Sequence, residues 1–118
     1  MAVTLVKLKD LPTGLQDFSP GIVQKDAIAS PNTEKMAVSY YEVEPGAEMN
    51  VEMTFEEIGI VIEGSATLSD ETGRMCILEK GDVFSITKGT RISFRSEAGF
   101  KGIAIMPCNW KEILPKEK

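Results

Sequence analysis

The chain has 118 residues, the length of one domain, so we expect a single domain over residues 1–118 with one hydrophobic core. Hydrophobic residues make up 42% of the sequence and charged residues 26%, as in ordinary globular proteins, and the formal net charge is −5. Because the lysines and arginines are scattered over an acidic chain, the sequence predicts no nucleic-acid partner and no membrane partner.

Two further observations bear on where the protein acts. No apolar run approaches the ~20 residues that span a bilayer, and the first ten residues show no signal-peptide cleavage site. Cys76 and Cys108 are the only cysteines, and two cysteines without a secretory signal indicate reduced thiols. We therefore expect a cytoplasmic protein in which both thiols behave as small buried hydrophobic groups.

The first segment in chain order is residues 1–35, which we expect at the edge of the fold. The alternation in "AVTLVKL" predicts a strand, and the prolines and glycines that follow predict only short strands and irregular chain. This segment should lie across a barrel edge or against a partner subunit. Since Val3, Leu5 and Leu8 must be buried somewhere, we expect a homodimer.

The barrel core is expected over residues 36–106, where short runs are rich in β-branched and aromatic residues. The predicted strands cover residues 36–44, 48–54, 57–63, 74–79, 82–87, 91–96 and 100–106. Turn signals separate them: Gly64 ends one strand, and "DETG" forms a hairpin tip in which Gly73 can be left-handed. This spacing predicts an all-β antiparallel sandwich or small barrel. Residues 107–118 form a tail with one aromatic anchor, Trp110.

Two stretches, "EEIGIVIEG" and "GDVFSITKG", resemble the two signatures of the cupin superfamily. Glu57 and Gly64 match the end of the first signature, and Gly81 and Gly89 match the frame of the second. The resemblance implies a cupin-type antiparallel β-barrel, also described as a double-stranded β-helix or jelly roll. It further implies that the signature side chains point into the barrel.

With "NW" further along, the same stretches resemble one cupin branch in particular, the ethanolamine-utilisation EutQ proteins, which also lack the cupin histidines. That resemblance implies a role in small-metabolite chemistry involving ethanolamine or acetyl phosphate, because an acetate-kinase role has been attached to the branch. The chain has no glycine-rich phosphate loop with a lysine, the feature that would favour phosphoryl transfer.

The metal ligands of a typical cupin are missing. The histidines of the first signature would fall within residues 51–54, and the histidine of the second signature falls at Ile92. A cupin centre for iron, manganese, nickel or zinc needs imidazole ligands, and this chain contains no histidine. Only Glu57 remains of the ligand set, so we predict no metal site and no cofactor.

Strand alternation indicates what the barrel interior contains. Glu57, Gly59 and Val61 should share the inner face of their strand. By the same alternation, Ile92 and Phe94 should face inward from the strand that normally supplies the last histidine. The interior is then apolar, with one carboxylate at its rim or floor.

The register of the strand at 48–54 is open between two alternatives, because a shift by one residue exchanges its faces. In one register the polar side chains face inward: Asn50, Glu52 and Thr54. In the other the apolar side chains do so: Met49, Val51 and Met53. The spacing from Gly46 favours the polar register, whereas the spacing back from Glu57 fits neither.

Adjacent tyrosines, Tyr40 and Tyr41, must face opposite ways, and either could donate a phenol hydroxyl to a ligand or fill the core. The arginines Arg91 and Arg95 alternate with apolar residues and should lie on the outer surface. We expect four methionines to pack in the core: Met49, Met53, Met75 and Met106.

Burial in an apolar barrel raises the pKa of a carboxyl group, and such a glutamate can act as a general acid or base near neutral pH. The leading hypothesis is therefore a metal-independent enzyme that isomerises, dehydrates or cyclises a small, largely apolar molecule, with Glu57 and Tyr41 as catalytic residues. The expected substrate-binding residues are Asn50, Glu52, Thr54, Tyr40, Val61, Ile92 and Phe94.

The alternatives are a non-catalytic binding or assembly cupin and the EutQ-like metabolic role. A barrel packed solid would favour the non-catalytic module. An open cavity with Glu57 in its wall would favour the enzyme.

Overall fold

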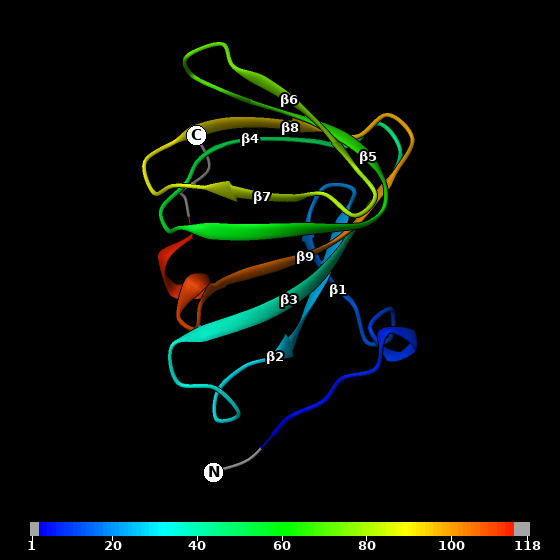
Figure 1. The fold of residues 1–118 in the computed structure, drawn as a ribbon, viewed down its shortest axis with the longest axis vertical. Helices are drawn as coiled ribbons and strands as arrows, with labels where there is room; N and C mark the ends of the chain where they lie inside the picture. The colour runs from blue at the N-terminus through cyan, green and yellow to red at the C-terminus, as the bar shows by residue number, and fades with distance from the viewer. Residues whose placement is uncertain (1–2, 115–118) are drawn as a thin grey trace.

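The computed structural model describes residues 3–114 of the chain, and the fold is built almost entirely from antiparallel strands. The strands, labelled in Figure 1, are β1 (Gln16–Ser19), β2 (Ile22–Ile28), β3 (Met36–Val43), β4 (Glu48–Glu52), β5 (Glu57–Asp70), β6 (Met75–Glu79), β7 (Val83–Ile86), β8 (Arg91–Arg95) and β9 (Phe100–Pro107). Two short 3₁₀ helices, η1 (Leu8–Asp10) and η2 (Trp110–Ile113), complete the described elements. Neither is long enough to cross a membrane.

The strands form one curled sheet in the order β1-β2-β3-β9-β5-β8-β4, and β6 and β7 both pair with β5. Every strand pair is antiparallel. Figure 1 shows β4 and β8 above and β3 and β9 below, with β5 and β7 between them. The antiparallel barrel predicted from the sequence is therefore confirmed.

Strand β5 is twice as long as the sequence pattern suggested. We expected Gly64 to end a strand at residue 63, but β5 continues to Asp70. Gly64 has a φ of +83°, and an added Cβ would collide with the carbonyl oxygen of Gly99, so only glycine fits here. Beside a bulge after Val61, the strand moves from pairing with β9 and β7 to pairing with β8 and β6.

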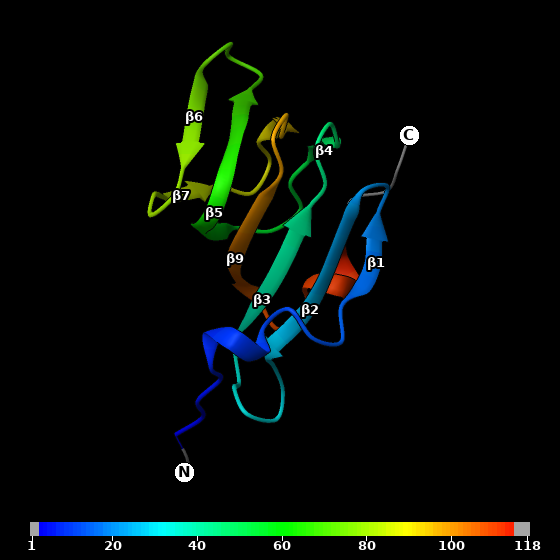
Figure 2. The same ribbon diagram turned by 90° about the vertical axis from the view of Figure 1, so that its right-hand side faces the viewer.

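The N-terminal strand prediction is wrong over the described residues 3–7, which form no strand. Val3 is 99% exposed and Leu5 is 73% exposed, because no neighbouring strand pairs with this stretch in the single chain. The strands of the predicted edge segment are β1 and β2 instead, and β2 joins the sheet through β3. Figure 2 shows β1 and β2 next to β3 at that edge of the sheet.

The core lies inside the curled sheet, with Trp110 of η2 buried against it. Four methionines are predicted to pack in the core, and for Met75 that prediction is wrong. Met75 is 65% exposed, because its side chain on β6 points away from the barrel. Cys76 and Cys108 are free and half-buried rather than fully buried.

Candidate functional site

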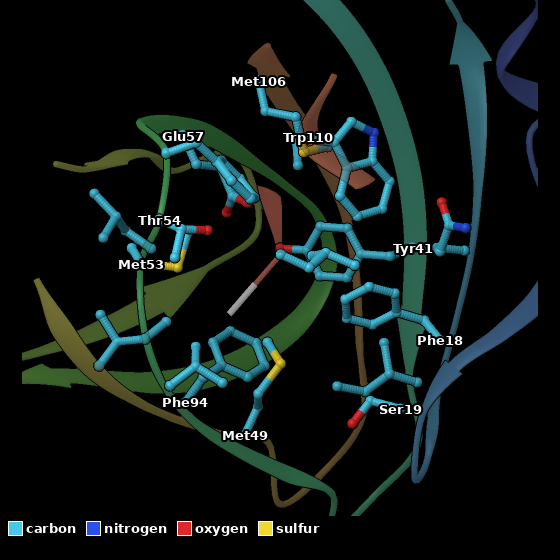
Figure 3. Close-up of a pocket in the computed structure, with 18 of the residues that line it drawn as sticks. Phe18, Ser19, Tyr41, Met49, Met53, Thr54, Glu57, Phe94, Met106 and Trp110 are labelled. Atoms are coloured by element: carbon cyan, nitrogen blue, oxygen red, sulfur yellow. The ribbon is translucent and has the colours of Figure 1, made fainter. Parts of the chain in front are cut away.

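A cavity of about 750 Å³ opens inside the barrel, within the size range of small-molecule sites. Its walls come from β1, β2, β3, β4, β5, β7, β8 and β9, and η2 lies at one side. The lining is mainly apolar and rich in aromatic rings: Phe18, Tyr41, Phe55, Phe84, Phe94 and Trp110. Figure 3 shows most of these side chains pointing into a common space.

Glu57, the first residue of β5, lines this cavity. Burial raises the pKa of its carboxyl to about 7, because the apolar surroundings disfavour the charged form. No ion pair among the described residues involves Glu57. Two residues along β5, Gly59 makes room for the Phe84 ring, which an added Cβ would strike. The carboxyl group is therefore held in an apolar wall that favours its protonated form.

Tyr41 points into the same cavity from β3, and Figure 3 shows it and Glu57 reaching inward from different walls. Its ring stacks on Phe100, with centroids 5.7 Å apart. The ring also packs over Gly102 of β9, where an added Cβ would lie 2.8 Å from the Tyr41 hydroxyl oxygen. Burial, and next the charge of Glu57, raise the pKa of Tyr41, so its hydroxyl keeps its proton at neutral pH.

Tyr40, predicted to bind substrate, does not line the cavity. Because neighbouring strand residues face opposite ways, its side chain lies on the other face of β3. There its hydroxyl donates a hydrogen bond to Glu42 Oε2 at 2.7 Å. Of the two tyrosines, only Tyr41 reaches the site.

The polar register favoured for β4 is wrong. Met49 and Val51 face the core, since they pair with Phe94 and Ile92 of β8. Asn50 and Glu52 are exposed and only border the cavity at its rim. Apolar pairs across β4 and β8 bury more hydrophobic area than a polar ladder would, which decides the register.

Thr54 lines the cavity as predicted, but not through strand alternation. The described strand β4 ends at Glu52, and the irregular chain that follows buries Met53 and Phe55 on either side. The Thr54 hydroxyl donates a hydrogen bond to the carbonyl oxygen of Ile113. This bond ties the loop after β4 to η2 beside the cavity.

Ile92 and Phe94 line the cavity, as predicted, but Val61 does not. Val61 is 1% exposed and pairs with Gly102, over which the rings of Tyr41 and Phe100 pack. These rings fill the interior at this level, so Val61 belongs to the core beneath the cavity.

Sequence reasoning missed one wall altogether. Phe18 of β1 and Gln24 of β2 line the cavity, and so does Ser39 of β3. Phe18 and Gln24 lie in the segment before residue 36, which the sequence places at the edge of the fold, whereas Ser39 lies in the predicted core. The alternation in "IVQKDAI" was the available signal, because it places Gln24 on one face with Ile22.

The residues present do not fit a cupin metal centre. Val51 to Thr54 and Ile92 occupy the positions of the signature histidines, and Glu57 is the one remaining oxygen ligand. Within residues 3–114, no three histidine, cysteine, aspartate or glutamate side chains gather closely enough to hold an ion. Glu57 in the wall, with Glu48 and Glu52 exposed at the edge of the cavity and no imidazole, does not make the ligand set of an iron, manganese or zinc centre.

The curled antiparallel barrel has the fold of the cupins, as solved structures of similar fold show. An RmlC-like cupin from Shewanella frigidimarina NCIMB 400 superposes with a TM-score of 0.75 at 14% identity, over 96% of this chain and 97% of that one. The polyketide cyclase RemF from Streptomyces resistomycificus gives a TM-score of 0.74 at 19% identity, over 91% and 80% of the two chains. At these identities the likeness shows the fold alone.

Within the cupins, the chain belongs to the family of the ethanolamine utilisation protein EutQ, whose sequence profile matches residues 3–112. A putative ethanolamine utilization protein Q from Salmonella typhimurium LT2 has a similar structure, with a TM-score of 0.66 and 23% identity. The match covers 73% of this chain and 68% of the Salmonella chain. No curated protein sequence matches the chain significantly.

Proposed function

We propose that this protein is a metal-independent cupin enzyme that binds a small, largely apolar organic molecule in the barrel. Glu57 transfers a proton to or from the bound molecule, and Tyr41 orients one of its oxygen atoms. The reaction class is isomerisation, dehydration or cyclisation. The observation that carries this proposal is the carboxyl of Glu57, which borders an open cavity and has a pKa of about 7.

The cavity itself supports a catalytic role over a purely structural one. A barrel serving only assembly has no need for an open internal space of about 750 Å³ with a lone buried carboxyl in its wall. An unpaired buried acid costs stability, and groups with such perturbed pKa values concentrate at functional sites. RemF, one of the chains of similar fold, is an enzyme, a polyketide cyclase. That likeness agrees with the proposal.

The lining does not favour the phosphoryl chemistry suggested by the EutQ resemblance. Among the described lining residues the only cation is Arg91, which is exposed at the rim and paired with Glu52 at 3.4 Å. A phosphate group inside the cavity would face Glu57 without a positive partner. We therefore expect acetyl phosphate to leave the melting temperature unchanged.

The test compares Glu57→Gln with Glu56→Gln in metal-stripped protein. A panel of neutral cyclic and aromatic compounds is first screened for stabilisation of the fold, and the compounds that bind are assayed for turnover. Glu57→Gln keeps the shape of the side chain but cannot transfer the proton, so turnover should fall about 10²–10⁴-fold.

Glu56 is the matched control, because it is the exposed neighbour of Glu57 and removes the same charge. Glu56→Gln should keep the wild-type rate. Full activity in Glu57→Gln would refute the role of Glu57.

A further inference from the structure

The cavity wall on β1 and β2 carries a polar group that the proposed reaction does not use. Gln24 is 7% exposed and lines the cavity from β2. Phe18 borders the cavity from the neighbouring strand β1, and its ring lies 5.8 Å from the Trp110 ring, measured between centroids. The indole of Trp110 is held by Asp26, two residues along β2 from Gln24. The amide of Gln24 therefore lies in an aromatic part of the wall.

Ser39 holds the oxygen of this amide. The Ser39 hydroxyl lies 3.1 Å from Gln24 Oε1 and 3.1 Å from the carbonyl oxygen of Lys25, and it can donate to either. The Gln24 amide nitrogen has no hydrogen-bond partner among residues 3–114. No fully buried side-chain nitrogen or oxygen in this part of the chain lacks a partner, so the nitrogen borders open space. Because Gln24 lines the cavity, that space is the cavity.

The one carboxylate of β2 does not supply the missing acceptor. Asp26 accepts a hydrogen bond from the Trp110 indole at 3.2 Å and pairs with Lys111 at 3.3 Å. Between Asp26 and Gln24 the described part of the chain shows no hydrogen bond. A largely buried N–H without an acceptor destabilises a fold, so an acceptor atom of a ligand would gain the bond at a place that is already desolvated.

The Gln24 donor lies apart from Glu57 and Tyr41. Tyr41 is paired with Gln24 across β2 and β3, but its hydroxyl lies over Gly102 of β9, on the other side of β3 from β2. Glu57 is on β5, three inter-strand spacings of about 4.8 Å each from β2 along the curled sheet. In the view of Figure 3, Glu57 and Phe18 lie on opposite sides of the Tyr41 ring. A bound molecule therefore meets Gln24 and Glu57 at two different ends.

We propose that Gln24 binds a second, uncharged oxygen of the substrate, a carbonyl or hydroxyl group remote from the reacting end. This inference rests on the proposed function and narrows its substrate to a largely apolar ring compound with an oxygen at each end. The aromatic rings of the wall suit such a body. A neutral N–H suits a neutral acceptor, because the only cation among the described lining residues, Arg91, is exposed at the rim. An anionic group beside Gln24 would be buried without a positive partner.

Gln24 would then determine specificity without taking part in proton transfer. Anchors at both ends of a molecule fix which of its carbon atoms faces Glu57. A wall built to hydrogen-bond one oxygen also discriminates against analogues that lack it, because its N–H is then left unpaired. Loss of Gln24 should therefore reduce selectivity for compounds that carry the remote oxygen.

The test compares two probes with the same apolar body. One probe, 2,6-dihydroxynaphthalene, has a hydroxyl at each end and is identical when turned around, whereas naphthalene has no oxygen. Both are titrated calorimetrically at neutral pH, where the hydroxyls are uncharged, and wild type should bind the dihydroxy compound more tightly. Gln24→Leu should weaken its binding about 3–10-fold, the effect of one hydrogen bond between neutral groups, and should change naphthalene binding less than about twofold.

Two features of the wall make this comparison clean. Ser39 keeps the Lys25 carbonyl as an acceptor in Gln24→Leu, so the variant leaves no orphaned hydroxyl. Ile22→Val is the matched control, because it changes the cavity lining on the same strand without removing a donor, and it should alter both probes by the same factor. Equal weakening of both probes in Gln24→Leu, or equal affinity of both for wild type, would overturn the inference.

Nuclear magnetic resonance tests the same bond in unsubstituted protein, whether or not Gln24→Leu folds. Gln16 and Gln24 are the only glutamines, so labelling glutamine with nitrogen-15 gives two side-chain amides, and Gln16→Glu assigns them. Gln16 pairs with Gln24 across β1 and β2 but is exposed and does not line the cavity, so it is the internal reference.

Relative to naphthalene, 2,6-dihydroxynaphthalene should move an amide proton of Gln24 downfield and leave Gln16 in place. The same Gln24 shift with both probes would contradict the inference. Failure of the proposed function would appear separately, as unchanged turnover in Glu57→Gln, because neither binding measurement involves proton transfer.

Discussion

The carboxyl of Glu57 makes the stability of the protein depend on pH in a direction opposite to that of a typical surface acid. Its pKa is about 7 in the folded protein and about 4.3 in an unfolded chain. Below about pH 4 the Glu57 carboxyl is protonated in both the folded and the unfolded state, so its raised pKa does not reduce the stability of the fold. Between these values the unfolded state ionises first, so stability falls as pH rises to about 7 and is level above it.

Glu57→Gln removes this dependence. Relative to wild type, the variant should gain roughly 3 kcal/mol in unfolding free energy between pH 4 and pH 8. Urea denaturation at pH 4, 6 and 8 measures the difference. Glu56→Gln, at an exposed position, should run parallel to wild type. A Glu57→Gln curve that also runs parallel would show that the carboxyl is not buried in the folded protein.

Substituting Gly102 should change both stability and ligand affinity, because the Tyr41 ring packs over this residue. Gly102→Ala places a methyl group 2.7–2.8 Å from the Tyr41 and Phe100 rings. We expect a loss of about 1–3 kcal/mol from overpacking and a lower affinity for cavity ligands as Tyr41 shifts. Thermal melts with and without ligand separate these effects. An unchanged affinity would mean that Tyr41 does not contact the ligand.

At the scale of the elements, the sequence predicted strand existence well and facing directions unevenly. Seven runs between 36 and 106 all became strands, because β-branched residues and turns mark them locally. The face of β4 depends on β8, a partner far away in the chain, and local spacing does not encode that pairing. The full length of β5 could not be predicted for a similar reason. Gly64 is required by its close approach to the carbonyl oxygen of Gly99, a distant part of the chain, and not by a turn that ends the strand.

Substitutions on β4 and just after it test its register. Met53→Ala should cost about 2–5 kcal/mol, because Met53 is 6% exposed in the core. Glu52→Ala should change stability by less than about 0.5 kcal/mol, because its ion pair with Arg91 is exposed. Chemical denaturation of both variants measures the contrast. A costly Glu52→Ala beside a harmless Met53→Ala would restore the polar register.

At the scale of the whole molecule, the barrel and its acid could be predicted, whereas the cavity wall on β1 and β2 could not. Glu57, Ile92 and Phe94 belong to strands whose alternation is plain in the sequence, whereas alternation alone leaves open which of Tyr40 and Tyr41 faces inward. The wall formed by Gln24 and its neighbours depends on how β2 joins β3 across a long loop. That join is a tertiary contact, which local patterns do not specify.

Metal content is a property of the whole protein that follows from the missing histidines. Protein purified without chelator should contain much less than one equivalent of iron, manganese, nickel, copper or zinc per chain by elemental analysis, because the chain offers no imidazole. Turnover should survive dialysis against a chelator. One tightly bound metal per chain that is needed for activity would contradict this prediction.

We also predict a homodimer, because Val3 and Leu5 are exposed apolar residues in the single chain. Light scattering at micromolar concentration should give twice the chain mass of 12.9 kDa. Leu5→Glu should shift the mass toward one chain, whereas Lys7→Glu should not. A clean one-chain mass for the wild type would count against a dimer.

Trp110 gives the cavity an optical signal of its own. It is the only tryptophan in the sequence, it lines the cavity, and its indole N–H donates to Asp26 Oδ1 at 3.2 Å. The Phe55 ring meets it edge-on, with centroids 6.3 Å apart. Any molecule that enters the barrel therefore changes the surroundings of the sole indole fluorophore, so emission intensity and wavelength report occupancy in unlabelled protein without knowledge of the reaction.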